Sequence, residues 1–196
     1  LLAEQTGITA DAAAYESNLE LIATVAGADP ALVRKWGAAF GASHGTRRIG
    51  LVWAGNPDNK TDYKRSIPLD VFAPLLDMPG CSFFSLQVGD AAMELEALDT
   101  TVRPVPLFSE KRPLTEVAAA ISSLDLLITV DTSLAHLAGA LGWPVWTAIT
   151  FVPDWRWGLG RPDTPWYDSM QLFRQPDIGN WPGVVAALRN ALAETV

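Results

Sequence analysis

Short apolar runs alternate with segments of helical periodicity from Arg48 to the end of the chain. The apolar runs predict six strands, over Ile49–Ala54, Ser82–Gln87, Val102–Leu107, Leu126–Val130, Val145–Ile149 and Gln171–Arg174. The segments between them predict helices over Leu69–Leu76, Ala91–Leu98 and Leu114–Ser122, after Ser133, and over Pro182–Glu194. Leu126–Val130 shows no polar alternation, which is typical of a parallel strand buried on both faces. The pattern therefore predicts an α/β fold with a doubly wound, Rossmann-like parallel sheet.

The expected strand order is 3-2-1-4-5-6, which is common among doubly wound sheets with six strands. Prolines interrupt Val102–Leu107, so this strand is predicted at an edge. Strands one and four then lie side by side where the order reverses. The loops after Ala54 and Val130 should face one crevice at the carboxyl edge of the sheet.

The first 47 residues predict helices and no strand. Thr9–Val25 is rich in Ala and Leu, and a second helix is signalled by Asp29 as N-cap, Pro30 in the first turn, and Gly41 or Gly45 as the stop. We expect residues 1–47 to form a helical connecting segment and residues 48–196 to form the Rossmann-like lobe. Because the chain begins Leu-Leu-Ala, without methionine or a recognisable signal peptide, we expect it to be a piece of a longer protein.

Composition narrows the class of protein. The 196 residues are 49% hydrophobic and 18% charged, which suits one compact unit. The net charge of −8 argues against a nucleic-acid partner, because such a surface must be basic. No apolar stretch approaches the roughly 20 residues of a transmembrane helix. The one cysteine, Cys81, excludes an internal disulfide and is compatible with a reducing cytoplasm, where we expect the protein to be located.

The turn Asp131-Thr132-Ser133 follows a buried strand and begins a helix. Each of these side chains can cap that helix, whose N-terminus offers unpaired N–H groups and the positive end of the helix dipole. This arrangement favours phosphate binding. His136 lies one turn into the helix, where a packed core histidine and a ligand contact are both open.

The loop after the first strand carries three of the chain's fourteen Lys and Arg residues, namely Lys60, Lys64 and Arg65. Arg65 can hold two phosphate oxygens with its planar guanidinium, and Gly55 lets a ligand approach the backbone. The alternative is a solvated loop whose cations pair with Asp58 and Asp62. Gln87 either contacts a ribose or base or caps the end of the second strand.

Other chemistries lack their motifs. The first strand runs into Gly55-Asn56-Pro57 instead of G-x-G-x-x-G, and no Walker pattern occurs. The sequence has no D-x-D pair, so a metal that bridges a diphosphate has no obvious carboxylate ligands. We expect neither a metal nor a cofactor. Ser133 lacks the glycines of a hydrolase nucleophile elbow.

Several motifs together resemble one family. They are I-G-L-V-W-A-G-N-P at Ile49–Pro57, K-R-S-I-P-L at Lys64–Leu69, S-L-Q at Ser85–Gln87, D-T-S-L-A-H-L-A-G-A at Asp131–Ala140, P-D-W-R-W-G-L-G-R at Pro153–Arg161, P-W-Y at Pro165–Tyr167 and L-F-R-Q at Leu172–Gln175. The set is similar to the carboxyl-terminal lobe of glycosyltransferase-like proteins found behind tetratricopeptide repeats in bacteria, which are related to the lipopolysaccharide heptosyltransferases. The resemblance covers roughly residues 48–196.

The resemblance implies the second lobe of a type-B glycosyltransferase, which holds a nucleoside diphosphate sugar of the UDP, GDP or ADP type. The implied diphosphate contacts are Lys64, Arg65, Asp131, Thr132, Ser133 and His136, with Ser133 in place of the family's usual glycine. The implied nucleoside or sugar contacts are Gly55, Asn56, Gln87, Trp155 and Arg156. The general base in this fold usually comes from the first lobe or the acceptor side, and no counterpart is assigned here. The implied partner is a missing N-terminal lobe or repeat domain.

The Trp-rich loop from Phe151 to Tyr167 has two interpretations. Its aromatic side chains can stack on a base or sugar, or they can pack inward while Asp–Arg pairs hold the loop shut. We favour inward packing for most of them. Trp155 and Arg156 are the better candidates for ligand contact because they closely follow the fifth strand.

Two classes of function follow from the sequence. The first is a metal-independent glycosyltransferase lobe that acts on a glycan or protein acceptor. The second is a non-catalytic nucleotide-binding or interaction module that retains the fold.

Overall fold

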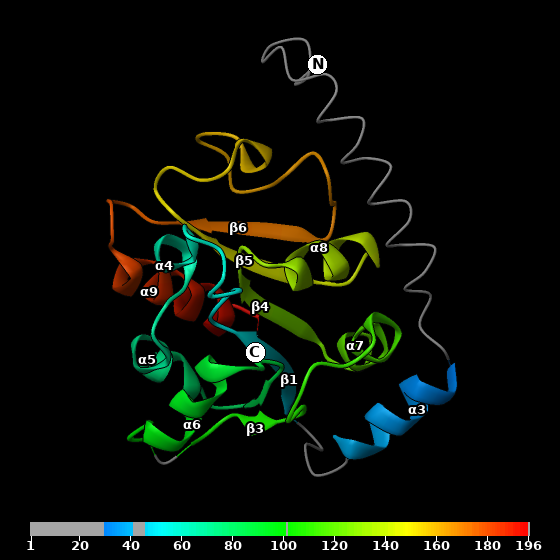
Figure 1. Ribbon diagram of the computed structural model, residues 1–196. Helices are drawn as coiled ribbons and strands as arrows, with labels where there is room; N and C mark the ends of the chain where they lie inside the picture. The colour runs from blue at the N-terminus through cyan, green and yellow to red at the C-terminus, as the bar shows by residue number, and fades with distance from the viewer. Residues whose placement is uncertain (1–29, 41–45, 101, 196) are drawn as a thin grey trace.

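The computed structural model describes residues 30–40, 46–100 and 102–195. Six strands form one parallel sheet in the order β3-β2-β1-β4-β5-β6 (Figure 1). The strands are β1 (Arg47–Val52), β2 (Cys81–Ser85), β3 (Val105–Pro106), β4 (Leu126–Val130), β5 (Val145–Ile149) and β6 (Met170–Arg174). This order confirms the doubly wound topology that the sequence predicts, with β1 beside β4.

Helices cover both faces of the sheet (Figure 1). One face carries α3 (Pro30–Ala39), α7 (Leu114–Ile121) and α8 (Ser133–Ala140). The other face carries the 3-10 turn η1 (Leu69–Phe72), which continues into α5 (Ala73–Leu76), and α9 (Trp181–Ala193). The remaining short elements are α4 (Asp62–Arg65), η2 (Asp90–Met93), α6 (Glu94–Ala97) and η3 (Trp155–Trp157).

Alternating side chains of the central strands supply the two halves of the core. Leu127 packs beneath α7 and α8, whereas Leu126 and Ile128 pack on the side of α5 and α9. All five residues of β4 are buried. Each fully buried Leu or Ile side chain stabilises the fold by about 1.5–3 kcal/mol relative to leaving it exposed. The strand therefore stays in the centre of the sheet and presents its carboxyl end as a rigid support.

Helix α3 packs against the lobe. The Trp36 ring meets Phe108 edge-on with centroids 5.1 Å apart, and Lys35 forms an ion pair with Glu116 of α7 at 2.9 Å. The expected helix over Thr9–Val25, the Asp29 cap and the stop at Gly41 or Gly45 lie outside the described residues. The division of the chain at residues 47 and 48 stays a prediction.

The predicted elements differ from the structure mainly at their ends. The edge strand β3 has two residues where the sequence predicts six, because Pro104 and Pro106 have no N–H to donate to a ladder. Helix α4 falls in a loop that the sequence predicts as irregular. Within the described residues, no helix has the length and apolar character needed to cross a membrane.

Candidate functional site

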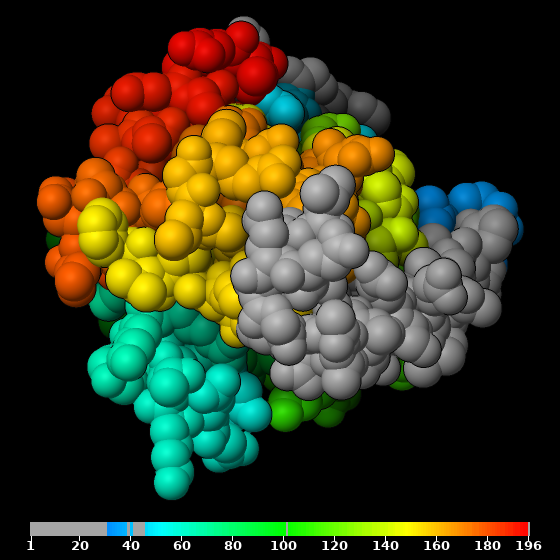
Figure 2. All heavy atoms as spheres, turned by 90° about the horizontal axis from the view of Figure 1, so that it is seen from above, coloured from blue at the N-terminus to red at the C-terminus, as the bar shows by residue number. Residues whose placement is uncertain are grey.

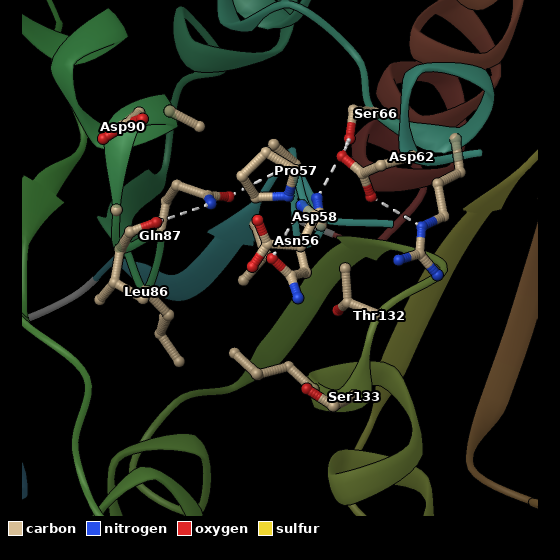
Figure 3. Close-up of a pocket in the computed structure, with 18 of the residues that line it drawn as sticks. Asn56, Pro57, Asp58, Asp62, Ser66, Leu86, Gln87, Asp90, Thr132 and Ser133 are labelled. Carbon is tan, nitrogen blue, oxygen red and sulfur yellow. Dashed lines mark hydrogen bonds and ion pairs between the residues drawn. The ribbon is translucent and has the colours of Figure 1, made fainter. Parts of the chain in front are cut away.

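A cleft of about 640 Å³ opens at the carboxyl edge of the sheet, where β1 and β4 lie side by side (Figure 3). Its walls come from the loops after β1 and β2, the loop before α7, and the turn between β4 and α8. The lining residues are Val52, Ala54, Gly55, Asn56, Pro57, Asp58, Asp62, Arg65, Ser66, Leu86, Gln87, Val88, Gly89, Asp90, Ala91, Lys111, Thr132, Ser133 and Leu134. The two loops expected to share a crevice therefore do so.

A hydrogen-bonded network shapes the wall that follows β1. The Asp62 side chain, in a residue only 8% exposed, accepts hydrogen bonds from Arg65 Nε at 2.9 Å and Ser66 Oγ at 2.6 Å. Ser66 Oγ in turn accepts one from the backbone N–H of Gly55 at 3.1 Å (Figure 3). The Asp62 pairing that the sequence leaves open is thus present for Arg65. Among the described residues this pairing uses only Nε, so the two terminal guanidinium nitrogens of Arg65 can still donate to a ligand.

Gln87 ties two loops together. Its Oε1 accepts hydrogen bonds from the N–H groups of Trp53 and Ala54 at 3.2 and 3.0 Å, and its Nε2 donates to the carbonyl of Val88 at 3.2 Å. The side chain borders the cleft, but these bonds occupy its oxygen and one amide hydrogen. These bonds cap the end of β1, and the contact of Gln87 with a ribose or base stays a prediction.

The turn before α8 differs from the predicted cap. Thr132 occupies the N-cap position, with φ −131° and ψ 172°, but makes no side-chain cap hydrogen bond. Its hydroxyl instead lies 3.1 Å from Thr129 Oγ1, because residue 132 is buried against the end of β4. The predicted side-chain cap at this helix is therefore wrong. Exposed Ser133 and the start of α8 face the cleft without a capping side chain from Thr132, which suits an anionic ligand.

His136 lies behind this turn and does not line the cleft. Its ring stacks on Trp157 with centroids 5.1 Å apart, and Nδ1 lies 3.0 Å from the Tyr167 hydroxyl oxygen. Nε2 lies 3.9 Å from Asp131 Oδ1. Burial lowers the pKa of His136 to about 4, with Asp131 opposing the shift, so the ring is neutral at pH 7. The packed interpretation of this histidine describes what the structure shows.

The Trp-rich loop packs largely inward. Trp157 and Tyr167 are buried, while Arg156 pairs with Asp154 at 3.2 Å and Arg161 with Asp163 at 2.7 Å. In Figure 2, residues coloured yellow to orange, which include this loop, cover a large part of the face. Trp155 meets Trp166 edge-on at 6.1 Å between centroids. Neither Trp155 nor Arg156 lines the cleft, so their role in ligand binding stays a prediction.

The structure brings together part of the predicted site. Gly55, Asn56, Arg65, Gln87, Thr132 and Ser133 line the cleft, whereas Lys64, Asp131, His136, Trp155 and Arg156 do not. Lys64 is exposed, with Nζ 5.8 Å from the centroid of the Tyr63 ring. Sequence reasoning missed Asp90 and Lys111 as lining residues. Their position shortly after the second and third strands could have indicated them, because the carboxyl ends of parallel strands meet at one edge.

In the described part of the chain, no group of three His, Cys, Asp or Glu side chains could hold a metal ion. The cleft is lined by three carboxylates, a guanidinium, an ammonium and hydroxyls, and the N-terminus of α8 faces it. It can hold an anion by charge and hydrogen bonds.

Comparisons with known proteins agree with the fold. The chain has an α/β Rossmann-like fold that matches about half of a type-B glycosyltransferase fold, as seen in solved structures of a heptosyltransferase and of a family 9 glycosyl transferase. The sequence model of "Glycosyltransferase family 9 (heptosyltransferase)" matches residues 88–182, which include the turn before α8 and the Trp-rich loop.

Three similar proteins illustrate the likeness. Protein FlbA of Caulobacter vibrioides (strain ATCC 19089 / CIP 103742 / CB 15) is 29% identical over 170 residues, which cover 85% of this chain and 28% of FlbA. The E. coli ADP-heptose lps heptosyltransferase II has a TM-score of 0.56 at 16% identity, with 85% of this chain and 53% of that one covered. A glycosyl transferase of family 9 from Veillonella parvula DSM 2008 gives 0.55 at 20% identity, with 86% and 52% covered. The chain thus spans about half the length of these solved structures.

Proposed function

We propose that this chain is the donor-binding lobe of a metal-independent glycosyltransferase and that it holds a nucleoside diphosphate sugar in the cleft between β1 and β4. The observation that carries the proposal is the position of Arg65 and the start of α8 in one cleft at the switch point of the sheet. Ligands of open α/β sheets bind at this point. The family 9 match over residues 88–182 supports sugar transfer as the reaction class.

The proposed mechanism depends on how the protein stabilises the charge of the leaving group. Sugar transfer leaves negative charge on the departing diphosphate, and without a metal this charge is stabilised by fixed donors. The guanidinium of Arg65, the Ser133 hydroxyl and the N–H groups at the start of α8 would serve, each preorganised donor lowering the barrier by about 2–4 kcal/mol. Gly55 and Asn56 line the same wall and would meet the nucleoside or sugar.

Asp131 and His136 would act from behind the turn, since neither lines the cleft. We propose that the general base and the acceptor site, for a glycan or a protein, belong to an N-terminal lobe or repeat domain of a longer parent protein. The match covers only about half of each solved structure, which supports a second lobe. The same observation favours a second candidate, a module that binds nucleotide but transfers no sugar.

Calorimetric titration of the chain with UDP, GDP and ADP, and with their common sugar conjugates, tests the donor site. We expect saturable binding of one nucleotide, weakened about tenfold in Arg65→Ala through loss of charge-assisted hydrogen bonds. Arg112→Ala is the control, because Arg112 is an exposed arginine outside the cleft. Absence of heat with every nucleotide would contradict the proposal. Binding without transfer by the longer parent would favour the module.

A further inference from the structure

The cleft is lined by more carboxylates than cations, so a bound diphosphate depends on a lining cation that has no carboxylate partner among the described residues. Five lining residues carry charge, namely Asp58, Asp62, Asp90, Arg65 and Lys111. Asp62 already neutralises Arg65 through their ion pair at 2.9 Å. Of the remaining lining charges, Asp58 and Asp90 would repel a diphosphate and Lys111 would attract it. Lys60 and Lys64, the lysines that follow β1, do not line the cleft.

Lys111 lines the cleft and forms no ion pair with any carboxylate in the part of the chain that the structure describes. It lies in the loop between β3 and α7 and is exposed. Its neighbour Arg112 lies 3.7 Å from Glu110, whereas none of the ion pairs among the described residues includes Lys111. The ammonium group is therefore available to a ligand.

Lys111 and Arg65 approach the cleft from different loops. Arg65 follows β1 and Lys111 follows β3, and β2 lies between these two strands in the sheet. The two cations also differ in mobility. Asp62 holds the guanidinium in one orientation, whereas a lysine ammonium is a compact charge on a flexible stem that can follow its ligand.

We propose that Lys111 is a diphosphate-binding residue of this cleft and supplies the mobile positive charge that complements the fixed Arg65. This inference rests on the proposed donor site. It assigns to Lys111 the role that the sequence pattern gives to Lys64. The carboxylates of Asp58 and Asp90 then remain to accept hydrogen bonds from sugar hydroxyls.

Calorimetry on three variants of the chain tests the assignment. The probes are UDP, GDP and ADP, each with its uncharged nucleoside. We expect Lys111→Met to weaken the bound diphosphate about tenfold, as for loss of a hydrogen bond to a charged group, with the nucleoside unaffected. Lys111→Arg should restore most of the affinity. Arg112→Met, which alters the neighbouring exposed cation of the same loop outside the cleft, should change the affinity less than twofold.

The outcomes separate the inference from the function on which it rests. If the unmodified chain binds a diphosphate and Lys111→Met binds it equally well, the assignment of Lys111 is wrong and the donor site stands. An equal loss for nucleoside and diphosphate would also overturn it, because the effect would then be one of shape instead of charge. If the unmodified chain binds none of the three diphosphates, both fail. Equal thermal midpoints of the three variants show that each is folded.

Discussion

The carboxylate of Asp62 accepts a hydrogen bond from Arg65 Nε at 2.9 Å, three residues along the chain, and both side chains border the cleft. The Asp62 side chain is 11% exposed and the Arg65 side chain 25% exposed, so the pair is partly shielded from water. Asp62 also accepts from Ser66, which connects the pair to the backbone of Gly55. This relationship fixes one wall of the cleft before any ligand arrives.

Asp62→Ala should therefore destabilise the protein. The substitution removes two hydrogen bonds and leaves the donors of Arg65 Nε and Ser66 Oγ without this acceptor. We expect the free energy of unfolding to fall by about 1–3 kcal/mol, measured by urea denaturation. Asp58→Ala is the matched control in the same loop, because Asp58 is exposed; its effect should stay within about 0.5 kcal/mol. Equal effects of the two substitutions would show that the network contributes no stability.

Gly55→Ala should disturb the same pair from the backbone side. A Cβ atom at residue 55 would lie 2.1 Å from Asp62 Oδ1 and 2.9 Å from Arg65 Nη2, so the ion pair must move. We expect loss of about 1–3 kcal/mol in the free energy of unfolding, as for other overpacked sites. A double-mutant cycle with Asp62→Ala gives the test, since the clash needs the carboxylate. If the cost of Gly55→Ala is the same in both backgrounds, Asp62 is not its cause.

Much of the fold could be predicted because its strands are buried on both faces. The apolar runs Leu126–Val130 and Val145–Ile149 coincide with β4 and β5 at both ends. Their lack of polar alternation and their polar or proline neighbours define such ends well. Helix α4 could not be found in this way, because four residues show no periodicity and Asp62 fixes the segment by hydrogen bonds to its own loop.

The location of the candidate site on the sheet could be predicted from the sequence, but not all of its residues could. The carboxyl edge of β1 and β4 follows from strand order, and six of the eleven proposed residues line the cleft there. Which neighbouring cation faces inward does not follow, because Lys64 and Arg65 carry the same charge in the same loop. Asp62 selects Arg65 through a bond that exists only in the folded loop. Lys111 comes from a distant loop, and only its position after the third strand indicates that it can reach the same edge of the sheet.

Gly139→Ala should loosen the contact between α8 and the Trp-rich loop. The new methyl group would lie 2.4 Å from the Tyr167 ring. Alanine normally stabilises a helix interior relative to glycine by about 0.5–1 kcal/mol, and we expect this clash to reverse the sign and lower the free energy of unfolding. Gly37→Ala in α3 is the control, because its Cβ meets nothing within 4 Å. That variant should become more stable in urea denaturation. A stability gain in both variants would rule out close packing of Tyr167 on α8.

His136 should make the protein less stable as the pH falls from neutrality. Its pKa is about 4 in the folded protein against 6.5 ordinarily, with burial as the largest cause and Asp131, Arg156, Asp154 and Arg65 as the charges that act on it. Between these values the unfolded chain binds a proton that the folded protein does not, so protonation favours unfolding. The free energy of unfolding should drop by on the order of 3 kcal/mol from pH 7.5 to pH 4, and the contribution of this group levels off about one pH unit below its folded pKa.

Urea denaturation at pH 7.5, 6.0 and 5.0 on the unmodified chain and on His136→Gln measures this contribution. The variant loses the titrating ring, so its free energy of unfolding should depend less steeply on pH between 6.5 and 5, whatever its absolute stability. His44, the other histidine of the chain, is present in both proteins and cancels in the comparison. Parallel pH profiles would show that His136 titrates normally, and its burial between Trp157 and Tyr167 would then not hold in solution. A flatter profile for His136→Gln would show that the aromatic loop keeps this ring neutral behind the turn at Thr132.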